Sequence, residues 1–549
     1  MKRIVLPALL IVLAPGAGAQ KQPVDLLLTN ARIYTADESF STASAMAVKD
    51  GRIVAVGDGG QLRASYSAKT SIDAKGRFVY PGFIDAHAHF LGYGRGLQQA
   101  DLTGTTSWAQ VIGRLQAFVT KNKPAKGEWL IGRGWDQNDW AVKEYPDKTQ
   151  LDALFPDRPV LLTRVDGHAA IANTAALRAG NITAATTLTG GSVEVRNGVP
   201  TGILIDNAVD LATTAIPAPT RAQARRWLLA AQQHCFAVGL TTVDDCGLDF
   251  EAVQFIDSLQ RSGELRMRIY AMLSDAPHNF AWALAHGPLK TDRMNVRSFK
   301  VYADGALGSR GAALLRPYHD RPDWSGFLLS APEHFDSVAN VLYANNWQMC
   351  THAIGDSGNR TVLNIYAKYL GGTNDRRWRI EHAQVVAPED FALFGRYSII
   401  PSVQPTHATS DMYWAGDRLG PARVKGAYAY RQLLEQNGWL PLGTDFPVED
   451  ISPFKTFYAA VLRQDAKGYP AGGYQKENAL SRRQALWGMT LWAAKSNFEE
   501  GEKGSIEPGK WADFVILDRD LMKVEENKLL ATRVLATYVG GSAVFSRQR

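Results

Sequence analysis

The sequence predicts an α/β protein whose central part is a barrel of parallel strands, and three observations support this prediction. Short apolar runs alternate with helical patterns through the middle of the chain. Eight of these runs have the length of buried strands, the number that closes a (β/α)8 TIM barrel. Several of them end in a histidine, lysine or aspartate, where barrel strands carry their functional residues.

The first barrel strand ends in a histidine pair, in Pro81-Gly-Phe-Ile-Asp-Ala-His-Ala-His89. Residues i and i+2 of a strand point to the same side, so His87 and His89 converge on one point. Two neutral imidazoles suit a borderline metal such as zinc. A helix is predicted at 221–238. The other strands are predicted at 240–244, 266–272, 296–302, 347–352, 377–382, 397–403 and 439–445.

Both ends of the chain beyond the leader are rich in short strands and turns, at 20–80 and 495–549. Asp50-Gly51, between two apolar runs, indicates a hairpin. Neither end has enough strands for a stable sheet of its own, so we expect them to form one small composite β-sandwich. The barrel is expected at 81–494. The long stretch after its first strand predicts an inserted lobe, about 100–220, over the active-site end.

Residues 1–19 are interpreted as a cleaved signal peptide, with Lys2-Arg3, an apolar run at 4–14 and a cleavage site at Ala17-Gly-Ala19. The alternative is an uncleaved anchor. Cleavage removes two cations and no acid, so the formal charge falls from +6 to +4. With no dense Lys/Arg run, nucleic acid is not expected as a partner. The mature chain is predicted to be periplasmic or secreted, with no integral membrane segment and with homo-oligomerisation left open.

Six polar residues at the ends of five predicted strands form a candidate metal site. They are His87, His89, Lys300, His352, His382 and Asp445. A single strand-end histidine or aspartate is often a capping group, but this combination predicts a metal centre. Three cysteines are expected to be buried thiols, Cys235, Cys246 and Cys350. For Cys350, two residues before His352, ligation is the alternative.

The motifs around these residues resemble those of the amidohydrolase superfamily, in the amidohydrolase-3 branch that includes N-substituted formamide deformylases. They are Pro81–His89, Lys300-Val-Tyr-Ala-Asp-Gly-Ala-Leu-Gly-Ser-Arg310, His352-Ala-Ile-Gly-Asp356, Ile380-Glu-His382, Gly443-Thr-Asp-Phe-Pro447 and Gly504-Ser-Ile-Glu-Pro-Gly-Lys-Trp-Ala-Asp513. The resemblance extends over nearly the whole mature chain.

The resemblance implies two divalent metal ions, with zinc favoured by histidine ligation. His87 and His89 would hold one ion, His352 and His382 the other, and a carboxylated Lys300 would bridge them. The alternative for Lys300 is a buried ion pair with Asp304. Asp445 would bind metal and shuttle a proton for a hydroxide held between the ions.

Five further residues are candidates for substrate contact or for support of the site. Tyr302 and Asp304 share a strand face with Lys300. His168, in the lobe, is a candidate to bind or polarise the substrate, and Trp135 to line an aromatic pocket. The alternatives are a structural histidine and ordinary packing of the lobe. His407 follows the seventh strand and is a pocket candidate.

Together these features predict an exported hydrolase that cleaves a non-peptide C–N bond of a small molecule. The preferred substrate is a linear amide, either an N-substituted formamide or an N-acyl amine. One alternative is hydrolysis of cyclic amides, carbamates or esters on the same scaffold. The other is a metal-containing binding or regulatory protein that has lost activity.

Overall fold

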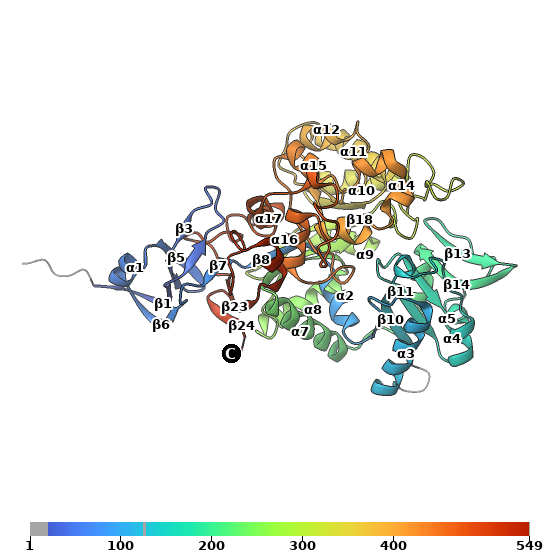
Figure 1. The fold of residues 1–549 in the computed structure, drawn as a ribbon, viewed down its shortest axis with the longest axis horizontal. Helices are drawn as coiled ribbons and strands as arrows, with labels where there is room; N and C mark the ends of the chain where they lie inside the picture. Colours follow the sequence, from blue (N-terminus) through green and yellow to red (C-terminus); the bar gives the residue numbers. More distant parts are fainter. Residues whose placement is uncertain (1–19, 125–127, 548–549) are drawn as a thin grey trace, which may run out of the picture.

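The computed structural model of the chain describes residues 20–124 and 128–547, and it extends from a small β-rich part through the barrel to the inserted lobe (Figure 1). Strands from both ends of the chain, blue and dark red, meet in the β-rich part, and the lobe is teal. The predicted signal peptide, 1–19, lies outside the described residues.

A nearly closed parallel barrel occupies the centre of the molecule. Its strands are hydrogen-bonded in the order β8 (Phe83–Ala88), β15 (Leu240–Leu248), β16 (Arg268–Ser274), β18 (Met294–Tyr302), β19 (Gln348–Ala353), β20 (Arg379–His382) and β21 (Ile400–Ser402). A short antiparallel strand, β17 (Leu289–Lys290), pairs with β18. The strands are buried along nearly all of their length, as expected of a sheet covered on both faces.

The eighth predicted strand is irregular, yet its backbone fills the gap between β21 and β8. Val403 N donates to Pro441 O over 3.2 Å on one side. On the other side Ala86 N donates to Leu442 O over 3.2 Å, and Asp445 N donates to His87 O over 2.7 Å. Pro441 has no N–H to give, which limits regular pairing here.

Helices surround the barrel (Figure 1). The predicted helix at 221–238 is α7 (Arg221–Ala237), which begins at a capping box of Thr220 and Gln223. The other helices of this part are α2 (Phe90–Gly96), α8 (Phe250–Arg261), α9 (Pro277–His286), α10 (Pro332–Ala344), α11 (Asp356–Leu370), α12 (Phe391–Arg396), α13 (Pro405–Asp411), α14 (Ala415–Arg423), α15 (Tyr430–Asn437), α16 (Pro453–Leu462), α17 (Arg482–Gly488) and α18 (Leu491–Ser496).

Two sheets pack together in the β-rich part. One has the order β5 (Arg52–Gly57), β4 (Ala45–Lys49), β1 (Gln22–Thr29) and β6 (Tyr66–Asp73). The other has the order β24 (Ser542–Ser546), β23 (Val534–Val539), β22 (Phe514–Leu517), β7 (Phe78–Pro81), β2 (Arg32–Tyr34) and β3 (Thr42–Ala43). Because β22 pairs directly with β7, both ends of the chain contribute to one sheet. Asp50 and Gly51 connect β4 to β5 with positive φ at both residues, as a tight hairpin turn requires.

A six-stranded sheet forms the lobe between β8 and β15. Its order is β13 (Gly191–Arg196), β14 (Val199–Asp206), β12 (Ala169–Ala172), β11 (Val160–Arg164), β10 (Leu130–Trp135) and β9 (Ala100–Asp101). Its helices are α3 (Trp108–Asn122), α4 (Thr149–Leu154), α5 (Thr174–Ala179) and α6 (Asn207–Thr213). Among residues 20–124 and 128–547, no helix combines the length and apolar character needed to cross a bilayer.

Candidate metal centre

The structure brings the six predicted metal-ligating residues together at the carboxyl ends of the barrel strands. The ring centroids of His87 and His382 are 4.7 Å apart, and those of His352 and His382 are 4.6 Å apart. Lys300 Nζ lies 3.2 Å from His87 Nε2. His89 Nε2 lies 3.2 Å from Asp445 Oδ1. Residues from distant parts of the chain therefore share one site.

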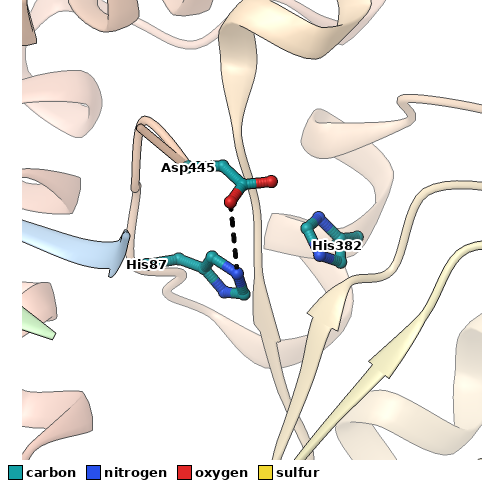
Figure 2. Close-up of side chains that lie close together, drawn as sticks. All are labelled: His87, His382 and Asp445. Carbon is teal, nitrogen blue, oxygen red and sulfur yellow. Dashed lines mark ion pairs between the residues drawn. The ribbon is translucent and has the colours of Figure 1, made fainter. Parts of the chain in front are cut away.

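His87, His382 and Asp445 form its centre, with one potential ligand atom from each lying within 4.8 Å of the others (Figure 2). Asp445 Oδ1 is 3.6 Å from His87 Nε2. His382 and Asp445 both have positive φ, +74° and +63°. Non-glycine residues seldom adopt this conformation, and it is concentrated at functional sites.

Hydrogen bonds behind the first two histidines direct their Nε2 atoms into the site. His87 Nδ1 lies 2.6 Å from Glu381 Oε2, and both side chains are fully buried. His89 Nδ1 lies 3.1 Å from the carbonyl oxygen of Cys246. A carboxylate or carbonyl that accepts from one ring nitrogen leaves the other available as a metal ligand.

Sequence analysis missed Glu381 although it lies in the motif Ile380-Glu-His382. Neighbouring strand residues point to opposite faces, so nothing in the sequence places Glu381 beside His87. Burial opposes its ionisation, but the His87 imidazole that donates to it and the nearby Arg379 guanidinium keep its pKa below the usual value. Glu381 is therefore an anionic acceptor.

The donor set fits a divalent metal. Burial lowers the pKa of His87 to about 4 and the pKa values of His352 and His382 well below the usual value, so the imidazoles are neutral. His352 Nε2 and His382 Nδ1 are buried and have no hydrogen-bond partner among the described residues. Buried polar atoms of this kind need an explanation, and neutral imidazole with carboxylate is a ligand set that zinc accepts.

Contacts between the first strand and the eighth segment explain two more motif residues. Thr444 Oγ1 donates to Asp85 Oδ2 over 2.7 Å, and Thr444 N donates to Asp85 Oδ1 over 2.9 Å. A Cβ on Gly443 would lie 2.6 Å from His87 N, closer than real contacts allow. Glycine is therefore required for Asp445 to reach the histidine pair.

A cavity of about 1300 Å³ lies over this site, between the barrel and the lobe. Three of the predicted substrate residues line it, Tyr302 and His407 from the barrel and His168 from the lobe. His407 Nε2 is 3.5 Å from Asp445 Oδ2. Trp414, next to the loop at the end of α13, also lines the cavity.

Trp135 and Asp304 are not among the residues that line the cavity, which favours lobe packing for Trp135 and support of the site, rather than substrate contact, for Asp304. Trp135 is fully buried in the apolar core of the lobe, where its indole N–H donates to Leu162 O over 2.8 Å. A tryptophan in a small inserted lobe is needed as core, and the sequence does not distinguish that use from a pocket.

Asp304 is also fully buried and organises the backbone around His352. It accepts from the backbone N–H groups of Ala313, Ile354 and Gly355 over 2.8–2.9 Å. Its Oδ1 lies 3.7 Å from His352 Nε2. Among the residues that the structure describes, Lys300 forms no ion pair with Asp304.

Asp206 is a second residue that sequence analysis missed. Its Oδ1 lies 2.6 Å from His168 Nδ1, and its φ is +49°. Cβ atoms on Gly305 and Gly311 would lie 2.5 and 2.3 Å from its carboxylate oxygens, so the loop after β18 closes around it. The lobe and the barrel are thereby joined at the side chain that orients His168.

Comparison with known proteins agrees with this geometry. The model of the family described as "Amidohydrolase family" matches residues 70–545. The chain is 33% identical to Protein LONG AFTER FAR-RED 3 of Arabidopsis thaliana over 97% of this chain and 93% of that protein. It is 26% identical to the N-substituted formamide deformylase of Arthrobacter pascens over 95% and 98%. An uncharacterised metal-dependent hydrolase from Pyrococcus horikoshii OT3 superposes with a TM-score of 0.75 at 28% identity, over 91% of this chain and 99% of that one. The chain belongs to the amidohydrolase family.

Proposed function

We propose that this amidohydrolase hydrolyses a linear amide, an N-substituted formamide or an N-acyl amine, by metal-dependent chemistry in the cavity over His87 and Asp445. The observation that supports the proposal most is the buried cluster of His87, His382 and Asp445, in which His382 Nδ1 has no hydrogen-bond partner among the described residues. The relative from Arthrobacter pascens, an N-substituted formamide deformylase, suggests the substrate class.

The strand-end histidines and Asp445 would hold two divalent ions, and zinc is the favoured metal. We assign His87, His89 and Asp445 to one ion and His352 and His382 to the other. Carboxylation of the buried Lys300 amine would convert a cation beside His87 into an anionic bridging ligand. Bound metal ions lower the pKa of water to about 7 and polarise a carbonyl oxygen.

Asp445 would accept the proton of the attacking water and deliver it to the leaving nitrogen. Burial alone would raise the pKa of Asp445, but His87, His89 and His382 lower it well below its usual value. The carboxylate is therefore ionised, which is the form that can accept a proton. Its Oδ1 and Oδ2 each face a histidine, so it has a fixed orientation in the cavity.

His168 would hold the substrate from the lobe side, oriented by Asp206 at 2.6 Å. Tyr302 and His407 would contribute further polar contacts to the wall. His168 and Asp206 thus form a polar pair on the lobe side of the cavity. Its placement over the metal ligand His352, with ring centroids 5.1 Å apart, supports a role in positioning the scissile amide.

We further propose that the mature chain begins at Gln20 and acts in the periplasm or outside the cell. The support is the leader-like sequence alone. N-terminal sequencing of protein recovered from a host cell tests this, and an intact Met1 would contradict it. Light scattering of the same material tests the homo-oligomer that the sequence leaves open.

A panel of N-formyl and N-acyl amines, assayed with and without a chelator, tests the activity. We expect turnover that the chelator abolishes and zinc restores, and turnover by Asp445→Asn that is lower by orders of magnitude. Turnover of only cyclic amides, carbamates or esters would contradict the linear-amide proposal and favour the alternative substrates. Stoichiometric metal with no turnover of any class would favour a binding or regulatory protein instead.

A further inference from the structure

Arg133 presents a guanidinium with few partners to the metal-centre cavity. It lies on β10 in the lobe, and its side chain lines the cavity. Arg133 Nη2 donates to the carbonyl oxygen of Val165 over 2.9 Å, and its Nε is buried without a partner. A guanidinium has five N–H donors, so most of this capacity is unused by the protein. Within the part of the chain that the structure describes, no carboxylate forms an ion pair with Arg133.

Of the five arginines that are buried in the described part of the chain, four have carboxylate partners. The fifth, Arg463, donates to the carbonyl oxygens of Tyr428 and Tyr474 and to the Gln475 side chain. Arg379 pairs with Asp244 at 3.0 Å. Arg268 pairs with Asp513 at 2.5 Å. Beside Arg133 in the lobe, Arg164 is bound by both Asp136 and Asp166. Charged groups removed from water are normally paired or hydrogen-bonded, whereas the half-buried Arg133 has neither a carboxylate partner nor the several acceptors of Arg463.

The guanidinium is held in place by the turn that carries His168. A Cβ on Gly167 would lie 3.2 Å from Nη2 and 3.3 Å from Nη1 of Arg133, so the backbone of the turn lies directly against the group. Gly167 has φ +82°, which also favours glycine. A guanidinium immobilised in this way has lost its conformational freedom before a ligand arrives.

Arg133 shares its cavity with candidate metal ligands. Burial lowers the pKa of Arg133, and the Asp166 and Asp445 carboxylates oppose this effect. Arg133, Asp166 and Asp445 line the same cavity, with Arg133 and Asp166 on its lobe side. His168 and the acidic residues Asp136, Asp139 and Asp166 of the lobe line the same cavity.

We propose that Arg133 binds a carboxylate of the substrate, so that the preferred substrates are amides that carry a carboxylate beside the scissile bond. This inference rests on the proposed amide hydrolysis. Guanidinium and carboxylate match in shape and form two parallel hydrogen bonds. The alternative is that Arg133 only offsets acidic residues of the wall, and then substrate charge would not depend on it.

The test compares N-formyl amino acids with their uncharged primary carboxamides. Wild-type protein should prefer the carboxylate, and Arg133→Gln should lose about ten- to a hundredfold in kcat/KM for it, the size of a charged hydrogen bond. The same variant should keep kcat/KM for the carboxamide within about threefold. Arg178→Gln is the matched control, because Arg178 is an exposed lobe arginine at the end of α5.

Equal losses for both members of each pair, or a wild-type preference for the carboxamide, would overturn the proposal. The wild-type preference is measured without the variant, so it tests the proposal even if Arg133→Gln does not fold. A calorimetric binding titration separates this proposal from the proposed reaction. If no N-formyl compound is hydrolysed, carboxylate binding that Arg133→Gln weakens would still support the role of Arg133. Equal binding of acid and carboxamide would refute it.

Discussion

Glu381→Gln should weaken metal binding while the fold persists. Glu381 Oε2 accepts from His87 Nδ1 over 2.6 Å, and neither side chain has exposed surface. The carboxylate keeps the proton on Nδ1 and the Nε2 lone pair toward the site. A glutamine can donate instead of accept, which would favour the opposite tautomer of His87.

The magnitude follows from the charge that is lost. A hydrogen bond to a charged group contributes about 1.5–3 kcal/mol and a neutral one about 0.5–1.5 kcal/mol. The difference of roughly 1–1.5 kcal/mol corresponds to about a tenfold loss of metal affinity, the lower end of the range for such residues. Arg379 keeps its 3.0 Å ion pair with Asp244, so no buried cation is left alone.

A competition titration of zinc against a chromophoric chelator measures the affinity. Glu435→Gln is the matched control, because Glu435 is an exposed glutamate on α15. Thermal melting of the metal-free variant reports on the fold. Wild-type affinity in Glu381→Gln would refute the reasoning, because the fully buried hydrogen bond would then have no effect on the ligand.

Three further predictions concern the same site. Asp445→Asn should lower kcat by about 10²–10⁴-fold with little change in melting temperature, and a fully active variant would contradict the proton-transfer role. Gly443→Ala should lower the free energy of unfolding by about 1–3 kcal/mol, because its Cβ would lie 2.6 Å from His87 N. The control Gly416→Ala, with nothing within 4 Å, should change that free energy by about 1 kcal/mol or less in a denaturant titration. Zinc at a hundredfold excess over its Kd should raise the free energy of unfolding by about 2.7 kcal/mol, so chelation should lower the melting temperature. An unchanged melting transition would argue against a metal centre.

The sequence predicts those parts of this protein in which local pattern determines structure. The helix at 221–238 has its own capping residues and apolar face, and it forms as α7. The hairpin at Asp50-Gly51 is likewise local. The strand-end histidines could be grouped because a parallel barrel brings all of its carboxyl ends to one rim.

The sequence does not predict which side chains from distant parts of the chain contact each other. Glu381 reaches His87 across 294 residues, and Asp206 reaches His168 from another strand of the lobe. The eighth strand was predicted as regular, but Pro441 and the close approach at Gly443 leave it irregular. The sequence left open whether Trp135 lines the pocket or packs in the lobe, because a tryptophan suits both environments.

Anomalous X-ray scattering at the zinc edge, from crystals of the protein grown with zinc, tests the central claim most directly. We predict two peaks, one beside His87, His89 and Asp445 and one beside His352 and His382. No peak at this rim, with the protein folded and zinc in excess, would contradict the assignment of these residues as a metal centre.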